Sequence, residues 1–181
     1  EPFMIVVVCL ASTIILFLLS PLIALFIAVD PVVFKKSLFE DPVLASEAWN
    51  SLYITLTAST TSTLILLAMG LPLAYILAYH EFMGKSFLEA LIDIPLMIPH
   101  AIAGIMILIA YGRLGLFSNI LGSIGVSVED SFWGIVFVMV FVSAPIMIDT
   151  LKIGFRNIDP DIVYVARSLG ASRWRAFYTI I

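Results

Sequence analysis

The sequence predicts an all-α polytopic membrane protein with four complete spans and the start of a fifth. Hydrophobic residues make up 62% of the 181 residues and charged residues only 12%, whereas soluble domains are about half apolar and about a quarter charged. The mean hydropathy is +1.14. The apolar residues also gather in runs long enough to cross a hydrocarbon core of about 30 Å.

Four apolar segments account for the complete spans: residues 3–29, 51–79, 87–111 and 131–151. We expect Pro21 to kink the first span, and Pro95 and Pro99 to break the third, because proline removes a backbone hydrogen bond from a helix. Polar loops are expected between the spans, at residues 30–50, 80–86 and 112–130. The chain begins without methionine and ends inside a new apolar helix, so we expect a fragment whose C-terminal end is incomplete.

Basic residues set the expected orientation in the membrane, because cytoplasmic loops are enriched in lysine and arginine. Six of the nine basic residues follow the second or the fourth span: Lys85, Lys152, Arg156, Arg167, Arg173 and Arg175. The other three follow the first or the third span: Lys35, Lys36 and Arg113. We therefore expect the N-terminus and the polar C-terminal segment to be cytoplasmic.

Composition and motifs argue against several functions. The net charge of −4 gives no support for nucleic-acid binding. The single cysteine, Cys9, excludes an intrachain disulfide and a cysteine metal cluster. The sequence has no glycine-rich loop followed by lysine and serine or threonine, which a phosphate site would need. Paired acids, a Ser–His arrangement and zinc-ligand spacing are not evident either, so we expect no catalytic or metal site on this chain.

The polar C-terminal segment, residues 159–175, reads as two short helices joined at a glycine. Asp159 can cap the first helix, and Pro160 suits its first position, where a missing N–H costs nothing. Gly170 suits the left-handed position that ends the helix, and Ser172 can cap the second helix. Apolar residues recur at three- and four-residue steps: Ile162, Val165, Ala166 and Leu169. A short amphipathic helix beside the membrane is a surface on which a cytoplasmic partner can dock.

The same segment resembles a known family motif. Tyr164, Val165 and Ala166, followed by Gly170 and Ile180, resemble the EAA loop of ABC importer permeases. Gly170 and Ile180 match the family spacing, whereas Tyr164 stands where the family has glutamate and Val165 where it has the first alanine. The Leu-Pro that closes the family pattern would lie beyond the last residue. A second run looks like the molybdate, tungstate and sulfate branch of these permeases: residues 70–78, 84–85 and 91–104.

The resemblance implies a type I ABC importer fold, with one transmembrane permease domain over residues 1–181, in the plasma membrane. It implies import of molybdate or tungstate, with sulfate or thiosulfate as the alternative. The implied partners are a second permease copy in a homodimer, two ATP-binding subunits that carry ATP and Mg²⁺, an extracytoplasmic substrate-binding protein, and membrane lipid. No cofactor is implied on this chain. The implied ATPase-coupling residues are Tyr164, Val165, Ala166, Leu169, Gly170, Ala171, Ser172 and Arg173.

Residues in the third span are candidates for the pathway of the ion. Pro95 and Pro99 free backbone carbonyl groups that protein or water must satisfy, so this region is expected to face the bundle interior, as a gate or as a packing kink. Asp93 and His100 are ionisable groups in an apolar stretch, which makes a function the default hypothesis. Asp93 lies near the cytoplasmic end and is expected to be structural. His100 either donates to an oxyanion or is a hydrogen-bonded packing residue.

Hydroxyl groups in the second span are further pathway candidates. Ser59, Thr63 and Gly70 can share one helix face, where small residues allow close helix packing. The alternative is a pathway wall that offers weak, multiple contacts to an anion. In the fourth span, Asp149 is expected to meet Lys152 or the membrane interface.

A different class stays open, namely a proton-coupled secondary carrier in which Asp93, His100 and Asp149 relay protons. Such carriers are typically built from internal repeats with broken helices at matched positions. The sequence has a broken stretch but shows no internal repeat.

Overall fold

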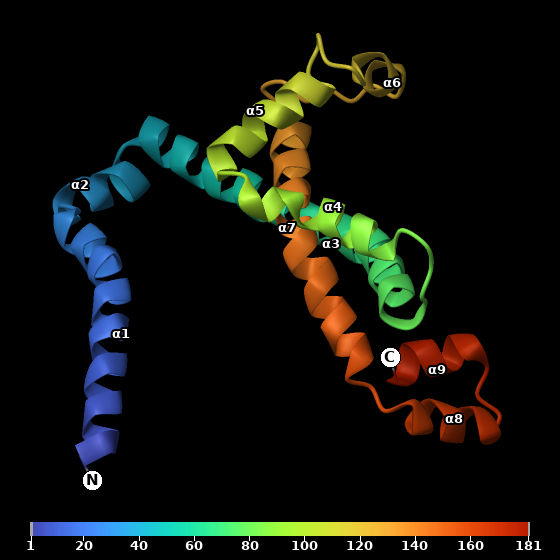
Figure 1. The fold of residues 1–181 in the computed structure, drawn as a ribbon. Helices are drawn as coiled ribbons and strands as arrows, with labels where there is room; N and C mark the ends of the chain where they lie inside the picture. Colours follow the sequence, from blue (N-terminus) through green and yellow to red (C-terminus); the bar gives the residue numbers. More distant parts are fainter. Residues whose placement is uncertain (1, 181) are drawn as a thin grey trace. The chain divides into compact units, whose positions relative to one another are not determined.

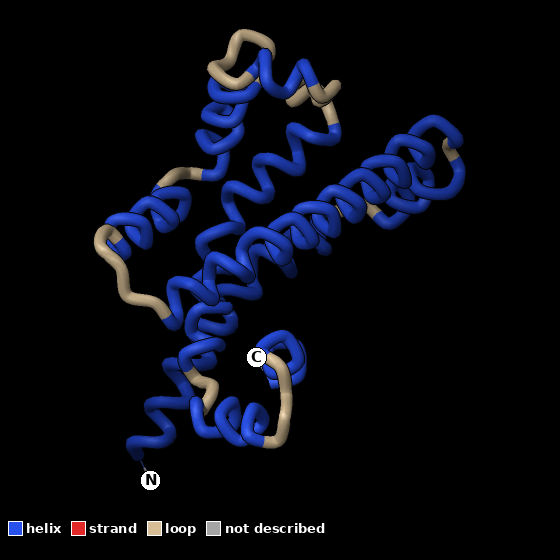
Figure 2. The backbone as a smooth tube through the Cα atoms, turned by 90° about the vertical axis from the view of Figure 1, so that its right-hand side faces the viewer, coloured by secondary structure: helices blue, strands red, loops and turns tan. Residues whose placement is uncertain are grey.

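The structure is a computed structural model, and it describes residues 2–180. Every element of regular secondary structure in this range is a helix (Figures 1 and 2). The chain divides into two compact units, Glu1–Tyr53 and Ile54–Ile181. The helical fold class predicted from composition is confirmed for these residues.

The first unit begins with α1 (Pro2–Ala28), which continues through Pro21 and has no buried residue. Next come α2 (Pro31–Lys35), a π-helical turn (Lys36–Glu40) and the start of α3 (Pro42–Tyr79). The prediction of a polar loop over residues 30–50 is therefore wrong for most of that segment. The reason is two Asp-Pro pairs, in which the aspartate caps a helix and the proline takes its first turn.

The two caps are well formed. Asp30 Oδ1 accepts a hydrogen bond of 2.8 Å from the backbone N–H of Val32. Asp41 Oδ1 accepts bonds of 3.0 and 3.2 Å from the N–H groups of Val43 and Leu44. Because of the second cap, α3 begins at Pro42 instead of residue 51 and reaches 38 residues in length.

The described residues of the second unit form the rest of α3 and six further helices. They are α4 (Lys85–Met97), α5 (His100–Tyr111), α6 (Ser118–Ser123), α7 (Phe132–Arg156), α8 (Pro160–Ser168) and α9 (Arg173–Ile180). Both α4 and α5 pack against α7 (Figure 1). The buried stripe of α3 consists of Ala58, Ser62, Leu66, Gly70, Ala74 and Leu77. Its last part forms a core with Ile148 and Phe155 of α7.

The third apolar segment is two short helices. The chain bends by 115° between α4 and α5, which confirms the predicted break. The break falls at Ile98, whose φ of −96° and ψ of 127° are extended, because a residue that precedes a proline disfavours the helical region. Pro95 lies inside α4 and does not end it. At 13 and 12 residues, each helix is about 18–20 Å long, shorter than the hydrocarbon core.

Within residues 2–180, three helices are long and apolar enough to cross a membrane: α1, α3 and α7. The bent pair α4 and α5 adds a fourth crossing only if the two helices together form one span. The two alternatives place α8 on opposite sides of the membrane, since each crossing reverses the direction of the chain.

Cysteine labelling decides between them. In a Cys9→Ala background, we expect Lys35→Cys and Arg167→Cys to react with a membrane-impermeant maleimide from opposite sides, because the lysine and arginine distribution favours four crossings. Asn119→Cys should react from the side of residue 35. Labelling of residues 35 and 167 from the same side would mean that α4 and α5 form a re-entrant pair, and would refute the orientation.

Candidate functional site

The ends of α8 are held by local hydrogen bonds. Asp159 Oδ1 accepts a bond of 2.9 Å from the N–H of Asp161, as the capping prediction required. At the other end, Gly170 has a φ of +89°. The N–H of Ala171 donates to the carbonyl of Ala166, and the N–H of Gly170 to that of Arg167, both at 3.0 Å. This pair of bonds is a Schellman motif, so α8 is a short helix with two fixed ends.

The second helix of the segment begins as predicted. Ser172 Oγ accepts a bond of 3.2 Å from the N–H of Arg175, and α9 starts at Arg173. The side chain of Arg173, which was predicted to take part in coupling, lies outside the described residues. Ala171 is half-buried and Ser172 is exposed in this turn.

The outer face of α8 is apolar and open. Ile162, Val165 and Leu169 are 54%, 60% and 84% exposed, and we call these three residues the α8 stripe. Tyr164 is also exposed, whereas Ala166 is half-buried. The predicted stripe is therefore present, with Ala166 at its inner edge. Three large apolar side chains on one short polar helix form a surface that the described part of the chain leaves uncovered.

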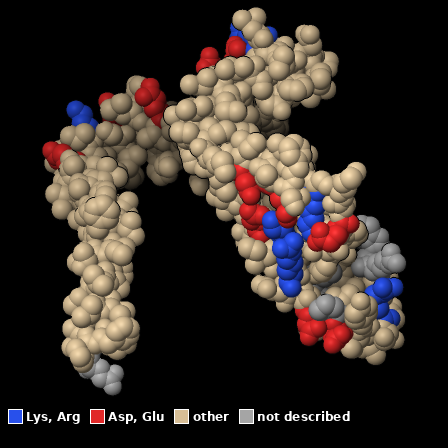
Figure 3. All heavy atoms as spheres, in the orientation of Figure 1, with Lys and Arg blue, Asp and Glu red and all other residues tan. Residues whose placement is uncertain are grey.

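Charges mark the two ends of α8. Asp159 and Asp161 lie at its N-terminus and Arg167 in its last turn, an arrangement that complements the helix dipole. Figure 3 shows acidic and basic side chains gathered over the region of α8 and α9. A partner that binds the α8 stripe therefore meets an apolar strip with opposite charges at its ends.

A second group of charges joins α4 to α7. Lys152 Nζ lies 2.6 Å from Asp149 Oδ1 and 3.2 Å from Glu89 Oε1. Asp93 interacts with Asp149 through its side chain. The expected contact of Asp149 with Lys152 is confirmed. Of the three residues proposed for a proton relay, the structure brings Asp93 and Asp149 together, whereas His100 is exposed at the start of α5, beyond the bend.

The predicted pathway residues lie in two places. Pro95 is buried in α4, while Pro99 and His100 are exposed at the bend. On α3, Ser59 is half-buried and Thr63 is exposed. Their hydroxyl groups donate to carbonyl oxygens one turn earlier in the same helix, at 3.0 and 2.8 Å.

A buried hydroxyl group on α3 is that of Ser62, which was not among the pathway residues predicted from the sequence. Ser62 is 4% exposed, and its Oγ lies 2.7 Å from the carbonyl oxygen of Ala58 and 3.3 Å from that of Val136 in α7. The signal that could have identified it is its place in the four-residue spacing of Ala58, Leu66 and Gly70. Its role is to join α3 to α7.

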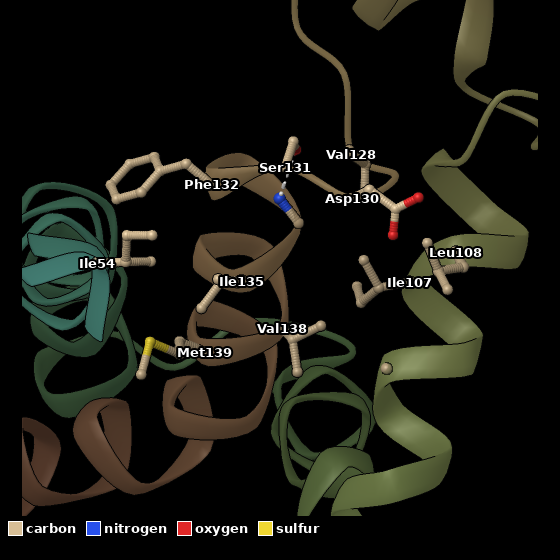
Figure 4. Close-up of a pocket in the computed structure, with 12 residues that line it drawn as sticks. Ile54, Ile107, Leu108, Val128, Asp130, Ser131, Phe132, Ile135, Val138 and Met139 are labelled. Atoms are coloured by element: carbon tan, nitrogen blue, oxygen red, sulfur yellow. Dashed lines mark hydrogen bonds between the residues drawn. The ribbon is translucent and has the colours of Figure 1, made fainter. Parts of the chain in front are cut away.

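A cavity of about 570 Å³ lies between α5, α7 and residue Ile54 of α3 (Figure 4). Ile107, Ile135 and Met139 are among the apolar side chains that form its walls, and Asp130 and Ser131 lie at its edge. Ser131 caps α7 by accepting a bond of 3.2 Å from the N–H of Gly134. The walls are mostly apolar and include the carboxylate of Asp130, which would repel an anion, so this cavity is not suited to bind an oxyanion.

The fold and the open helix together define a class, a multi-pass α-helical membrane protein with an exposed amphipathic helix between two of its helices. Residues 70–181 match the family described as binding-protein-dependent transport system inner membrane component. The chain belongs to this family. All residues of the α8 stripe and of the α4–α7 charge group lie within the matched region.

Three relatives illustrate the range of the family. The molybdate/tungstate transport system permease protein WtpB of Thermococcus kodakarensis is 42% identical over 173 residues, which are 94% of this chain and 63% of the relative. A probable sulfate transport system permease protein cysT of Chlorokybus atmophyticus is 32% identical, over 91% of this chain and 57% of the relative. The molybdenum transport system permease protein ModB of Escherichia coli K12 is 30% identical, over 76% and 61%. The chain thus spans less than two thirds of the length of these relatives.

Proposed function

We propose that this chain is the membrane-spanning permease subunit of an ATP-driven importer for molybdate or tungstate. The observation that carries the proposal is the α8 stripe, whose three side chains are each more than half exposed. The stripe lies within residues 70–181, which match a family of binding-protein-dependent transport components. The substrate class rests on the names of the relatives. Sulfate is the alternative, supported by the relative named as a probable sulfate permease.

In this proposal α8 is the coupling helix. The α8 stripe lies in an apolar groove of an ATP-binding subunit. The residues proposed to contact that subunit are Tyr164, Val165, Ala166, Leu169, Gly170, Ala171, Ser172 and Arg173. Because both ends of α8 are held by hydrogen bonds, the helix can transmit a displacement that a flexible loop would absorb. Closure of the two ATPase subunits then moves the permease between inward- and outward-facing states.

The proposed assembly contains two copies of this permease, two ATP-binding subunits and an extracytoplasmic binding protein. ATP and Mg²⁺ are held by the ATPase subunits, and this chain contributes no catalytic site and no cofactor. In this proposal the N-terminus and α8 are cytoplasmic, and residues 1–181 belong to one permease domain of the type I fold. The candidates for the pathway or its gate are Pro95, Pro99, His100, Ser59 and Thr63.

A proton-coupled carrier is the second candidate, since Asp93 and Asp149 interact across α4 and α7. Uptake measurements in proteoliposomes separate the two. The full-length permease, its ATPase and its binding protein are reconstituted, and uptake of labelled molybdate, tungstate and sulfate is followed. We expect uptake of one oxyanion, and only when ATP is present on the side of the membrane on which the ATPase subunits are bound. Uptake driven by a proton gradient without the ATPase would reject the proposal.

Placing a charge on the α8 stripe tests the docking surface. We expect Val165→Asp to reduce the amount of ATPase that co-purifies with the permease by about ten-fold or more, because an unpaired carboxylate would be buried in an apolar groove. Val32→Asp, the same change at a residue of α2 that is 72% exposed, is the control and should leave the complex intact. Equal recovery of the ATPase with Val165→Asp would remove the α8 stripe from the interface.

A further inference from the structure

The C-terminal end of α7 is tied to α3 by side chains that bond to backbone carbonyl groups. The Tyr79 hydroxyl donates to the carbonyl oxygen of Phe155 at 2.7 Å, across 76 residues of sequence. Arg156 Nη2 donates to the carbonyl oxygen of Leu77 at 3.4 Å. Tyr79 is the last residue of α3, and Phe155 lies in the last turn of α7. The Phe155 carbonyl also accepts a bond of 3.3 Å from the N–H of Ile158, so Tyr79 adds a second bond, from another helix, at the end of α7.

Aromatic side chains extend this tie to α9. The ring of Tyr75 lies 4.9 Å from that of Tyr79, 5.8 Å from Phe155 and 5.5 Å from Phe177, measured between centroids. The last two contacts are edge-to-face, a preferred arrangement of aromatic pairs. We call Tyr75, Tyr79, Phe155 and Phe177 the tyrosine cluster. It joins α3 both to the helix that precedes α8 and to the helix that follows it.

The turn between α3 and α4 is also fixed. Lys85, which is 6% exposed, donates from Nζ to the carbonyl oxygen of His80 at 3.1 Å and lies 2.6 Å from Glu81 Oε1. The hydrogen bond from Lys85 holds the pKa of the Glu81 carboxyl below its usual value. One turn further along α4, Glu89 pairs with Lys152 of α7. The end of α3, the start of α4 and the end of α7 are therefore connected by side chains.

We propose that Tyr79 is a positioning residue for α8. Its hydroxyl holds the last turn of α7, and its ring packs against Tyr75, whose ring meets Phe177 of α9. In this way α8 moves together with α3 instead of swinging about residues 157–159 and 170–172. This inference rests on the proposed function of α8 as the coupling helix. In this inference the Tyr79 hydroxyl, which lies outside the α8 segment, passes the movement of α8 on to the membrane-spanning helices.

The first test measures geometry and does not depend on transport. Nitroxide labels are placed at Met83→Cys, in the turn before α4, and at Arg167→Cys, in α8, with Cys9→Ala. Both sites are exposed. Labelled permease is diluted with an excess of unlabelled permease, so that a dimer carries at most one labelled copy. By pulsed electron–electron double resonance we expect a single narrow distance distribution between the two labels, and a clearly broader one when Tyr79→Phe is added. Tyr79→Phe keeps the ring and removes only the hydroxyl. An unchanged distribution would overturn the proposal.

The second test measures coupling in the reconstituted importer. With Tyr79→Phe we expect the ATPase to co-purify as with the wild type and to hydrolyse ATP within about two-fold of the wild-type rate. Oxyanion imported per ATP hydrolysed should fall about five-fold, in line with the loss of one hydrogen bond. Tyr53→Phe, the same change on α3 in the other unit, should keep the wild-type ratio. A wild-type ratio with Tyr79→Phe would overturn the positioning role.

The outcomes separate this inference from the proposed function. If the wild-type permease bound no ATPase and imported nothing with ATP, the proposed function would fail, and with it the coupling role of Tyr79. If the wild type imported normally and Tyr79→Phe changed neither the distance distribution nor the import ratio, only the inference about Tyr79 would fail.

Discussion

Lys152→Met is expected to lower the melting temperature of the full-length protein in detergent by roughly 4–12 °C. The Lys152 side chain is 15% exposed and bonds to Asp149 and Glu89, whose side chains are 34% and 27% exposed. Breaking a buried ion pair by removing one partner costs about 3–5 kcal/mol. The partial exposure of the two acids reduces this to about 2–3 kcal/mol, and each kcal/mol shifts the melting temperature of a chain of this size by about 2–4 °C.

Lys35→Met is the matched control for the loss of a paired lysine. Lys35 lies 3.0 Å from Glu40, but the two side chains are 71% and 54% exposed, and an exposed pair contributes about 0–1 kcal/mol. Its melting temperature should therefore stay within about 2 °C of the wild type. Lys152→Arg should retain most of the stability, because it keeps the cation between α4 and α7.

The penalty of Lys152→Met comes from the carboxylates left behind, and this can be tested separately. Neutralising them with Glu89→Gln and Asp149→Asn in the Lys152→Met background should restore part of the melting temperature, since an uncharged polar pair costs less to bury than two carboxylates. If Lys152→Met and Lys35→Met had the same melting temperature, the ion pairs of Lys152 with Asp149 and Glu89 would not hold α4 to α7.

Local signals predicted the C-terminal segment well. Asp159, Gly170 and Ser172 each act through neighbours within a few residues, so the type of residue and its position are enough to foresee the bond. The Asp-Pro pairs at Asp30 and Asp41 carry the same kind of signal. The loop prediction there followed the polarity of the segment and missed the caps, although the chemistry is that of Asp159 and Pro160.

Contacts between helices could not be predicted in the same way. The spacing of apolar residues tells which face of α3 is buried, but not that Ser62 meets the carbonyl of Val136 or that Tyr79 reaches Phe155. Those partners are 74 and 76 residues away in sequence. Their pairing depends on how α7 crosses α3, which no local pattern encodes. The same holds for the 115° bend between α4 and α5, since the prolines predict a break and leave its angle open.

Gly134→Ala is the second change with a large expected effect. It should destabilise the protein, although helix propensity alone would predict a gain in stability. Gly134 lies inside α7, where alanine is ordinarily better than glycine by about 1 kcal/mol. A Cβ at this position would, however, lie 2.1 Å from the backbone carbonyl oxygen of Val128. Val128 is 3% exposed, so this loop cannot move away without losing its own packing. We expect a net loss of about 1–3 kcal/mol.

Gly154→Ala supplies the matched control, because Gly154 lies in the same helix and a Cβ there meets nothing within 4 Å. Its melting temperature should equal or exceed that of the wild type, since the added methyl group restricts the unfolded chain and clashes with nothing. Gly134→Ala should melt below both, by about 2–12 °C. If the two variants melted alike, residues 128–131 would not rest on the first turn of α7.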